Sequence, residues 1–232
     1  MNAIEARDLA KSFVGGDGGR VDVLDGVSLD VRPGELVAIV GASGAGKSTL
    51  LHLLGALDRP SRGAVWLAGE ALEGRGDEEL AEMRNRRVGF VFQFHHLLRE
   101  FSALENVMMP MRIAGWEPAK ARTRATEVLE RVGLGARMSH RPAELSGGEQ
   151  QRTAVARALG MEPAVVLADE PSGNLDHANA ERLHEEFMRL VRELEIAMVV
   201  VTHNPSLASR ADRILVLEDG TLHATAGREV LA

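Results

Sequence analysis

Three short apolar runs recur along the chain, and each is followed directly by polar or charged residues. They are Leu36–Gly41 (LVAIVG), Ala164–Glu170 (AVVLADE) and Ala197–His203 (AMVVVTH). Apolar residues at successive positions, without polar alternation, are typical of strands covered on both faces, as in a parallel sheet. The pattern therefore predicts three buried parallel strands.

Helical periodicity fills much of the chain between these runs. It begins at Ser48 (STLLHLLGAL), recurs in the stretch after Leu145, and returns from about Ala178 to Glu195. A further helix is predicted at Asp77–Arg87, because its acids come first and its bases last, which suits both ends of the helix dipole. Strands that alternate with helices predict an α/β fold with a largely parallel sheet.

Four other regions depart from this alternation. Val21–Val31 alternates at period two, like a pair of half-exposed strands, and Arg32–Glu35 (RPGE) has the composition of a tight turn. Asp219–Gly220 predicts a hairpin between two strands near the C-terminal end. Phe94–Glu144 holds short amphipathic helices without clear strands. We therefore expect a single domain over residues 1–232, with an α/β core at about 1–93 and 145–232 and an inserted helical lobe at about 94–144.

Composition narrows the possible functions. The net charge of −7 argues against a general nucleic-acid binder, which needs a basic field to neutralise phosphates. The chain has no cysteine, so disulfides, thiolate metal sites and cysteine nucleophiles are excluded. The N-terminal stretch has early acids and no apolar core, so no signal peptide is expected, and the apolar runs are too short to cross a bilayer. Any membrane role is therefore expected to come through a partner.

Gly41–Thr49 (GASGAGKST) lies between a predicted buried strand and a predicted helix. It has the phosphate-loop pattern, in which a glycine is followed after four residues by glycine, lysine and serine. The glycines let successive N–H groups face phosphates, and the lysine reaches the β- and γ-phosphates. The serine hydroxyl ligates Mg²⁺. The loop predicts a nucleotide site. Its residues are Gly41, Ala42, Ser43, Gly44, Ala45, Gly46, Lys47, Ser48 and Thr49.

Two acids end the second apolar run. Asp169, at the carboxyl end of a predicted buried strand, is suited to hold the water shell of Mg²⁺. Glu170 beside it is suited to take a proton from an attacking water. Together with the phosphate loop, the pair predicts nucleotide hydrolysis.

Leu145–Arg152 (LSGGEQQR) is a second candidate anion site. Two adjacent glycines weaken a helix, whereas a serine hydroxyl and bare N–H groups at a helix start suit an anion. The sequence thus carries two phosphate-binding devices about a hundred residues apart.

Taken in order, these motifs resemble the nucleotide-binding domain of an ATP-binding cassette (ABC) protein. The motifs are GASGAGKST, a glutamine at Gln93, LSGGEQQR, VVLADE, SGNLD and VTH. The resemblance covers essentially the whole chain, and LSGGE is its most specific element. It implies an α/β fold with a RecA-like P-loop NTPase core, an antiparallel β subdomain and an inserted α-helical subdomain.

The resemblance also implies why two phosphate-binding devices are present. In this family two cassettes dimerise head to tail, so that the LSGGE segment of one subunit closes over the ATP held by the phosphate loop of the other. The chain is therefore expected to form a homodimer that sandwiches ATP and Mg²⁺. The residues expected to act on the partner's nucleotide are Ser146, Gly147, Gly148, Glu149 and, across the interface, Asp176.

Further roles follow from the same resemblance. Glu170 is expected as the catalytic base, with His203 on the γ-phosphate and Gln93 near Mg²⁺ and the attacking water. The metal is expected on Ser48, Gln93 and Asp169. Phe13 stands where the family often stacks a tyrosine on adenine, and phenylalanine has the same π-face. Asn204 stands where relatives commonly have aspartate after the histidine.

Within the family, three stretches resemble the cassettes of lipoprotein-releasing transporters in the inner membrane of Gram-negative bacteria. They are Val88–Met111, SHRPAELSGGE and ADEPSGNLDHANA. MacB-like exporter and FtsE-like cell-division cassettes share much of this pattern and stay as alternatives. The resemblance implies LolC- and LolE-like integral membrane subunits as partners, lipoprotein cargo handled only indirectly, and a location at the cytoplasmic face of the inner membrane.

Other classes fit less well. ABC ATPases that act on DNA insert long coiled coils, and Phe94–Glu144 is too short for one. Translation-type ABC proteins usually hold two cassettes in one chain, and a small-molecule kinase would not need LSGGE.

His95 and His96 lack the nearby carboxylates of a metal site and are read as loop residues beside a docking groove. The methionines between Met108 and Met111 fit either core packing or a docking surface. The charged helix from about Ala178 is read as solvated and amphipathic.

Overall fold

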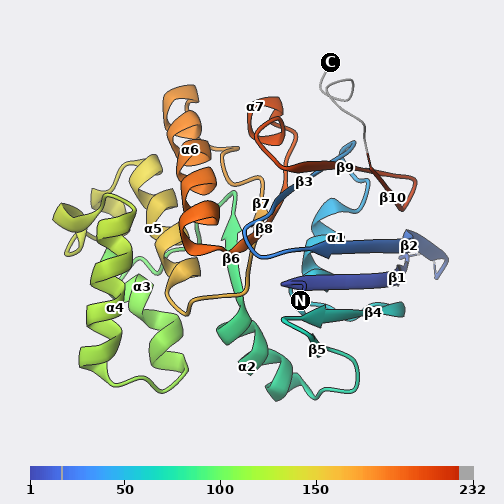
Figure 1. The fold of residues 1–232 in the computed structure, drawn as a ribbon, viewed down its shortest axis with the longest axis horizontal. Helices are drawn as coiled ribbons and strands as arrows, with labels where there is room; N and C mark the ends of the chain where they lie inside the picture. Colours follow the sequence, from blue (N-terminus) through green and yellow to red (C-terminus); the bar gives the residue numbers. More distant parts are fainter. Residues whose placement is uncertain (17, 225–232) are drawn as a thin grey trace.

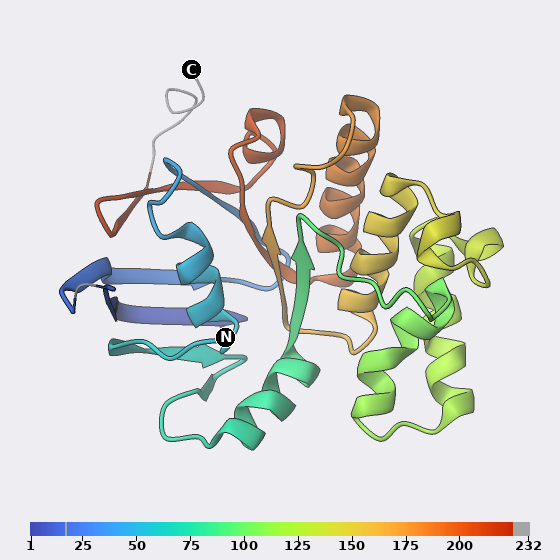
Figure 2. The same ribbon diagram turned by 180° about the vertical axis from the view of Figure 1, so that it is seen from behind.

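The computed structural model describes residues 1–16 and 18–224, which fold into two sheets and a set of helices (Figures 1 and 2). A six-stranded sheet runs through the centre in the order β10-β9-β3-β8-β7-β6, and all of it is parallel except β10. Its strands are β3 (Leu36–Val40), β6 (Val88–Phe92), β7 (Val165–Asp169), β8 (Ala197–Val201), β9 (Arg213–Glu218) and β10 (Thr221–Ala224). The three predicted buried strands are confirmed as β3, β7 and β8.

Side-chain alternation divides the central sheet into two apolar faces. On β3, Leu36, Ala38 and Val40 face the core shared with the helices, whereas Val37 and Ile39 face the core shared with the second sheet. The helix α1 (Lys47–Leu54) lies in this second core, between the two sheets (Figure 2). Burial on both faces explains the continuous apolar runs.

The second sheet is antiparallel, in the order β2-β1-β4-β5. Its strands are β1 (Ile4–Val14), β2 (Arg20–Val31), β4 (Arg62–Leu67) and β5 (Glu70–Ala71). The predicted strand pair at Val21–Val31 is wrong, because β2 runs through it unbroken. Asp25 and Gly26 together oppose Ala10, and Gly26 has φ 74°, so the Asp-Gly dipeptide makes a β-bulge rather than a hairpin turn.

The predicted turn and hairpin are confirmed. Glu35 donates its N–H to the Arg32 carbonyl at 3.1 Å, and Gly34 has φ 73°. Asp219 and Gly220 both have positive φ, as a two-residue hairpin loop requires, and join β9 to β10. Strand β6 has no counterpart among the predicted elements. Its Gly89 lets the strand approach α5 closely, since a Cβ there would lie 2.6 Å from the Ala158 carbonyl oxygen.

Helices cover the other face of the central sheet. They are α3 (Ala103–Ile113), α4 (Pro118–Arg131), α5 (Gly147–Leu159), α6 (His177–Leu194) and the short α7 (Pro205–Ala208). The predicted helix Asp77–Arg87 is confirmed as α2, whose Met83 packs in the core shared with the second sheet. Helices α3, α4 and α5 pack against one another beside the sheet (Figure 1). None of the helices in the described part of the chain has the length and apolar character needed to cross a bilayer. The bounds of the helical lobe stay a prediction, and residues 17 and 225–232 of the expected core lie outside the described residues.

Helix α6 is amphipathic, yet two of its titratable side chains are buried, so the interpretation as a simple solvated helix is incomplete. The His184 imidazole is fully buried and its Nε2 lies 3.0 Å from the Ser172 hydroxyl. Burial lowers the pKa of His184, although the Glu181 carboxylate opposes this shift. Glu186 is 8% exposed, and this burial raises its pKa to about 7 against the pull of Arg152 and Arg189. Helical periodicity does not reveal which polar positions the neighbouring helices cover.

Glu186→Gln is expected to stabilise the fold increasingly as the pH rises from 4.5 to about 7, and to do so fully above that range. A raised carboxyl pKa contributes stability below the ordinary value of 4.5, and that contribution is lost as the pH rises through about 7. At pH 8 the substitution should therefore raise the free energy of unfolding by about 1–3 kcal/mol, and at pH 4.5 by almost nothing. Urea unfolding at both pH values measures this. The exposed neighbour Glu185, changed to Gln, is the control, and an equal gain at both pH values would contradict the prediction.

Candidate active site

The candidate residues emerge at one edge of the central sheet because four parallel strands end in register. Phe92 lies opposite Asp169, Asp169 opposite Val201, and Val201 opposite Ile39. The residues that follow each strand therefore share this edge: Gln93, Glu170, His203 and the loop that begins at Gly41. Ligands of open α/β sheets bind at this edge.

The phosphate loop has the backbone that its glycines predict. Gly44 and Gly46 have φ 82° and 96°, and Gly46 is the left-handed N-cap of α1. A Cβ at Gly46 would lie 2.9 Å from Val23 Cγ1, and one at Gly41 would collide with the Leu217 carbonyl oxygen. The loop is thus held tightly between β2 and β9, and only glycine fits at these two points.

Lys47 is the first residue of α1 and directly follows the last glycine of this loop. Its ammonium group donates to the carbonyl oxygens of Gly41 and Ala42, both at 2.8 Å. The loop carbonyls hold the cation against the loop, and the N–H groups at the start of α1 add positive potential. The arrangement attracts phosphate.

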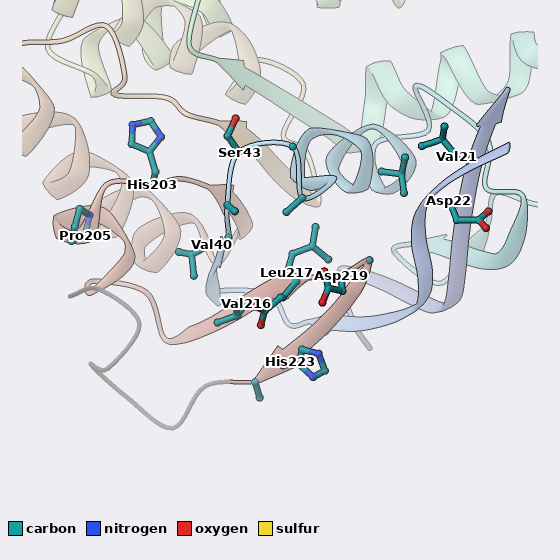
Figure 3. A pocket seen from close by; sticks show the side chains of 18 residues that line it. Val21, Asp22, Val40, Ser43, His203, Pro205, Val216, Leu217, Asp219 and His223 are labelled. Carbon is teal, nitrogen blue, oxygen red and sulfur yellow. The ribbon is translucent and has the colours of Figure 1, made fainter. Parts of the chain in front are cut away.

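A cleft of about 1410 Å³ opens over the phosphate loop. Figure 3 shows Ser43 and His203 at one end of it, Val21 and Asp22 at the other, and Asp219 and His223 along the β9–β10 side. The described residues that line the cleft include Gly41 to Ala45 but neither Lys47 nor Glu170, which lie outside its wall. None of Ser146 to Glu149 lines it. Within one subunit, the two predicted phosphate-binding devices are separate.

Glu170 and His203 are in direct contact. The His203 backbone N–H donates to Glu170 Oε1 at 3.0 Å, and the ring Nδ1 lies 2.7 Å from the same oxygen. The buried Thr202 hydroxyl donates to Glu170 Oε2 at 3.2 Å. Glu170 also has φ 45°, a left-handed conformation that is strained for a non-glycine residue. The strand end therefore positions this carboxyl, while the His203 side chain is 75% exposed and faces outward.

Gln93 is tied to the loop that follows Glu170. Its Nε2 donates to Asn174 Oδ1 at 3.0 Å, and Asn174 Nδ2 donates back to the Gln93 carbonyl at 3.1 Å. Gly173 provides the space, since a Cβ there would lie 2.9 Å from Gln93 Nε2. The two hydrogen bonds connect the start of the helical lobe to the segment that leads to Asp176.

Asn204 serves as the N-cap of α7. Its side-chain oxygen accepts from the N–H groups of Ser206 at 2.9 Å and Leu207 at 3.3 Å. Asparagine and aspartate are equally good N-caps, because each offers the same oxygen acceptor. Asparagine in place of the usual aspartate therefore keeps the cap of the helix that follows His203.

Phe13 lies on β1, 44% exposed, with the Lys11 ammonium 5.0 Å from its ring centroid. Lys11 is itself fixed by Asp58 at 2.7 Å and by the Arg59 carbonyl at 2.8 Å. The pKa of Asp58 is lowered, because the hydrogen bonds from Lys11 and Arg59 outweigh its partial burial. The ring is thus an exposed aromatic surface with a cation over it, and it does not line the cleft.

The second device lies at the start of α5. Ser146 is the N-cap: its hydroxyl accepts from the Glu149 N–H at 3.3 Å and donates to Glu149 Oε2 at 2.8 Å. Glu149 Oε2 also accepts from the Ser146 N–H at 2.8 Å, which completes a capping box. The Glu149 side chain is turned back toward Ser146 and Arg137.

Asp176 and Gly148 are linked through Asn179. Asp176 is the N-cap of α6 and accepts from the Asn179 N–H at 3.0 Å and from its side-chain amide at 2.6 Å. A Cβ on Gly148 would lie 2.8 Å from Asn179 Oδ1, so this glycine permits the contact. The first turns of α5 and α6 thus form one surface, which brings Ser146 to Gly148 close to Asp176.

Three oxygen donors suit a magnesium ion at the strand edge. Within the described part of the chain, no hydrogen bond or ion pair engages the Ser48 hydroxyl or the Asp169 carboxylate. Gln93 adds an amide oxygen, since its bond to Asn174 uses the amide nitrogen. Mg²⁺ prefers such hard oxygen ligands, commonly one carboxylate together with substrate phosphates. The residues present fit the ion.

Sequence reasoning did not find the residues that connect these parts. Asn174, Thr202 and Asn179 act through side-chain bonds, and helix α5 is also joined to the loop after β6. Gln151 Nε2 donates to the Phe92 carbonyl at 2.9 Å, and the Arg157 guanidinium donates to the carbonyls of His95 and His96 at 2.7 Å each. A polar residue in the buried face of a predicted helix, such as Gln151, is the one signal that points to such a role.

His95, His96 and the methionines are placed as follows. His95 is half-buried and its pKa is lowered by burial and by the nearby Arg157 cation, whereas the His96 ring is exposed. The described residues hold no group of three or more histidine, aspartate or glutamate side chains that could bind a metal ion. Met108 and Met111 are buried and Met109 is half-buried, which favours core packing.

A phosphate loop and a positioned carboxyl at the same edge of a largely parallel sheet, with a second antiparallel sheet, form the arrangement of a P-loop ATPase. The profile of the ABC transporter family matches residues 24–173. The chain belongs to the ABC transporter family, and it is an ATPase whose cofactors are ATP and Mg²⁺.

Curated relatives match along nearly their whole length. The "Lipoprotein-releasing system ATP-binding protein LolD" of Pseudomonas fluorescens is 54% identical over 95% of this chain and 97% of the relative. The protein of the same name from Geobacter metallireducens is 53% identical over 95% of this chain and 98% of the relative. Among solved structures, the dimeric post-hydrolysis state of the ATP-binding cassette MJ0796 bound to ADP and Pi matches with TM-score 0.85 and 35% identity, over 97% of this chain and 100% of that chain. The predicted fold class is confirmed.

Proposed function

We propose that this chain is the ATP-hydrolysing subunit of a lipoprotein-releasing transporter, located at the cytoplasmic face of the bacterial inner membrane. The observation that carries the proposal is the 50–54% identity to relatives named for that system over almost the whole chain. Identity at this level, together with the same set of motifs, supports the same activity. The subtype resemblance of Val88–Met111 points the same way.

The proposed chemistry places each side chain in a role. Glu170 takes the proton of the attacking water, and His203 hydrogen-bonds the γ-phosphate and orients that water. Lys47 and the loop N–H groups hold the β- and γ-phosphates. Mg²⁺, held by Ser48, Asp169 and Gln93, neutralises phosphate charge when bound. Phe13 supplies the surface on which adenine stacks.

The contact between His203 and Glu170 supports this assignment. The backbone N–H of His203 bonds the Glu170 carboxyl, so the carboxyl is held beside His203 at the strand edge. The His203 ring is 75% exposed, which leaves it able to turn from the carboxyl toward a phosphate. The base and the phosphate ligand thus lie within one hydrogen-bond length of each other before substrate arrives.

The proposed unit of activity is a head-to-tail homodimer. Ser146 and Gly147 are exposed at the start of α5 and do not line the cleft of their own subunit. Asp176 shares their surface through Asn179. A second copy that faces this surface with its phosphate loop would complete two equivalent sites, as expected of an isologous dimer. Closure on ATP and reopening after hydrolysis would then be the conformational change passed to other subunits.

The proposed membrane partners are LolC- and LolE-like subunits, docked near the loop after β6. Phe94, Leu98 and Phe101 are 65%, 41% and 37% exposed within eight residues of chain. Exposed apolar side chains gathered in this way mark a protein interface. The loop is bonded through its backbone to Arg157 of α5, so a displacement of the loop would be passed to the helix that Ser146 caps.

Reconstitution tests the proposed function. The chain, assembled with LolC- and LolE-like subunits in proteoliposomes that hold a fluorescently labelled triacylated lipoprotein, is expected to release that lipoprotein only with ATP and Mg²⁺. The Lys47→Ala chain is the matched control and should release none. ATP turnover that the membrane subunits stimulate without lipoprotein release, or failure to assemble with them, would reject lipoprotein release in favour of another transporter role.

A further inference from the structure

A carboxylate stands inside the segment that is proposed to receive a phosphate. Glu149, the third residue of α5, lies beside Ser146 and accepts both the hydroxyl and the N–H of that serine at 2.8 Å. The serine hydroxyl can donate only one hydrogen bond, and it donates that bond to Glu149. A negative group therefore occupies the place where the dipole of α5 would otherwise face an anion directly.

The charge of Glu149 is permanent near neutral pH. Its pKa is lowered to about 2 by the Ser146 N–H, the Arg137 guanidinium and the Ser146 hydroxyl, in that order. A phosphate that approaches Ser146 would therefore meet the full negative charge of Glu149, whose carboxylate lies 2.8 Å from the Ser146 hydroxyl. Like charges at short range repel, and they do so more strongly near a protein surface than in bulk water.

Arg137 is positioned to cancel this charge. Its Nε lies 2.9 Å from Glu149 Oε1, the carboxyl oxygen that Ser146 does not use. The arginine comes from outside α5, from the 3₁₀ turn η1 (Gly135–Arg137), whose backbone is fixed by bonds from Arg137 N–H to Leu134 and from His140 N–H to Arg137. The Glu149 side chain is 19% exposed and that of Arg137 is 47% exposed. The pair is thus held in place at the surface that would face a partner.

We propose that Arg137 is a positioning residue of the ATPase: it neutralises Glu149 and holds that carboxylate against Ser146, so that the start of α5 can accept the phosphate of ATP bound by a second subunit. This inference rests on the proposed head-to-tail dimer. Arg137 acts through Glu149 and Ser146 and need not touch the nucleotide itself.

The geometry makes the role of Arg137 conditional on the charge at position 149. A capping box needs only an oxygen acceptor at its third helical position, and glutamine serves as well as glutamate. In a Glu149→Gln chain the cap would remain while the negative charge disappears. Arg137 would then have no charge to neutralise, and its removal should matter little.

A double-mutant cycle tests this dependence. In a Glu170→Gln chain, which traps the ATP dimer, adding Arg137→Met is expected to weaken ATP-dependent dimerisation about tenfold, measured by analytical ultracentrifugation. With Glu149→Gln also present, the same Arg137→Met change should weaken dimerisation less than about twofold. ATP binding to the dilute monomer, measured with a fluorescent ATP analogue, should stay the same in all four chains. Arg137→Lys should restore part of the loss.

Arg141→Met is the control, because it removes an exposed arginine from the same loop while leaving intact the backbone N–H that bonds Glu144. It should not change dimerisation. Equal losses from Arg137→Met with and without Glu149→Gln would assign Arg137 a merely structural role and overturn the inference, as would no loss in either case. A parent chain that binds ATP yet never dimerises would overturn the proposed function first, and this inference with it.

Discussion

Glu170→Gln is expected to leave ATP binding intact while slowing hydrolysis by at least about 10²-fold, the range over which a general base contributes. Glutamine keeps an oxygen that can accept the His203 N–H, which Glu170 now binds at 3.0 Å, so the strand edge should hold its shape. It cannot take a proton from water. The chain should therefore bind ATP, close into a dimer and remain closed.

Two measurements check this result. Single-turnover release of labelled phosphate reports the chemical step, and size-exclusion chromatography with ATP and Mg²⁺ reports the trapped dimer. Glu218, which lines the cleft at the end of β9, offers a control carboxyl, and Glu218→Gln should hydrolyse ATP at close to the parent rate. If the Glu170→Gln chain hydrolysed ATP at nearly the normal rate, Glu170 would not be the catalytic base.

Mixing two inactive chains is expected to restore activity. Lys47→Ala removes the cation of the phosphate loop. Gly147→Asp puts a carboxylate where the partner's phosphate would sit, and the fold should tolerate it, since a Cβ there is 3.9 Å from the nearest atom and an acid in the first turn suits the helix dipole. In the mixed dimer one site carries both defects and the other carries neither.

The recovery has a calculable size. Random pairing makes half of the dimers mixed, and each mixed dimer has one intact site of two, so the mixture should reach up to about a quarter of the parent rate. Each variant alone should stay near background. Steady-state phosphate release from the separate and mixed chains measures this. Recovery no greater than either variant alone would contradict a site shared between subunits.

The sequence and the tertiary structure contributed different parts of the candidate site. The phosphate loop, Asp169, Glu170 and His203 are readable in the sequence because each lies at or just beyond the end of a buried strand, and strand, loop and helix are encoded by neighbouring residues. The same local encoding predicted β3, β7, β8 and the β9–β10 hairpin. The antiparallel sheet was predicted only through the family resemblance, since Val21–Val31 by itself indicated a pair of strands rather than the bulged β2.

By itself, then, the amino-acid sequence determined the class of fold and the family, and it indicated the candidate residues for the chemistry. Only the tertiary structure decided how those residues are held: Gln93 pairs with Asn174 across 81 positions, and Arg157 reaches the carbonyls of His95 and His96 across 62 and 61. It also decided that Glu186 is buried on a charged helix and that Arg137 meets Glu149. Such contacts depend on which faces of distant helices and loops pack together. The periodicity of a short stretch of chain does not predict this packing.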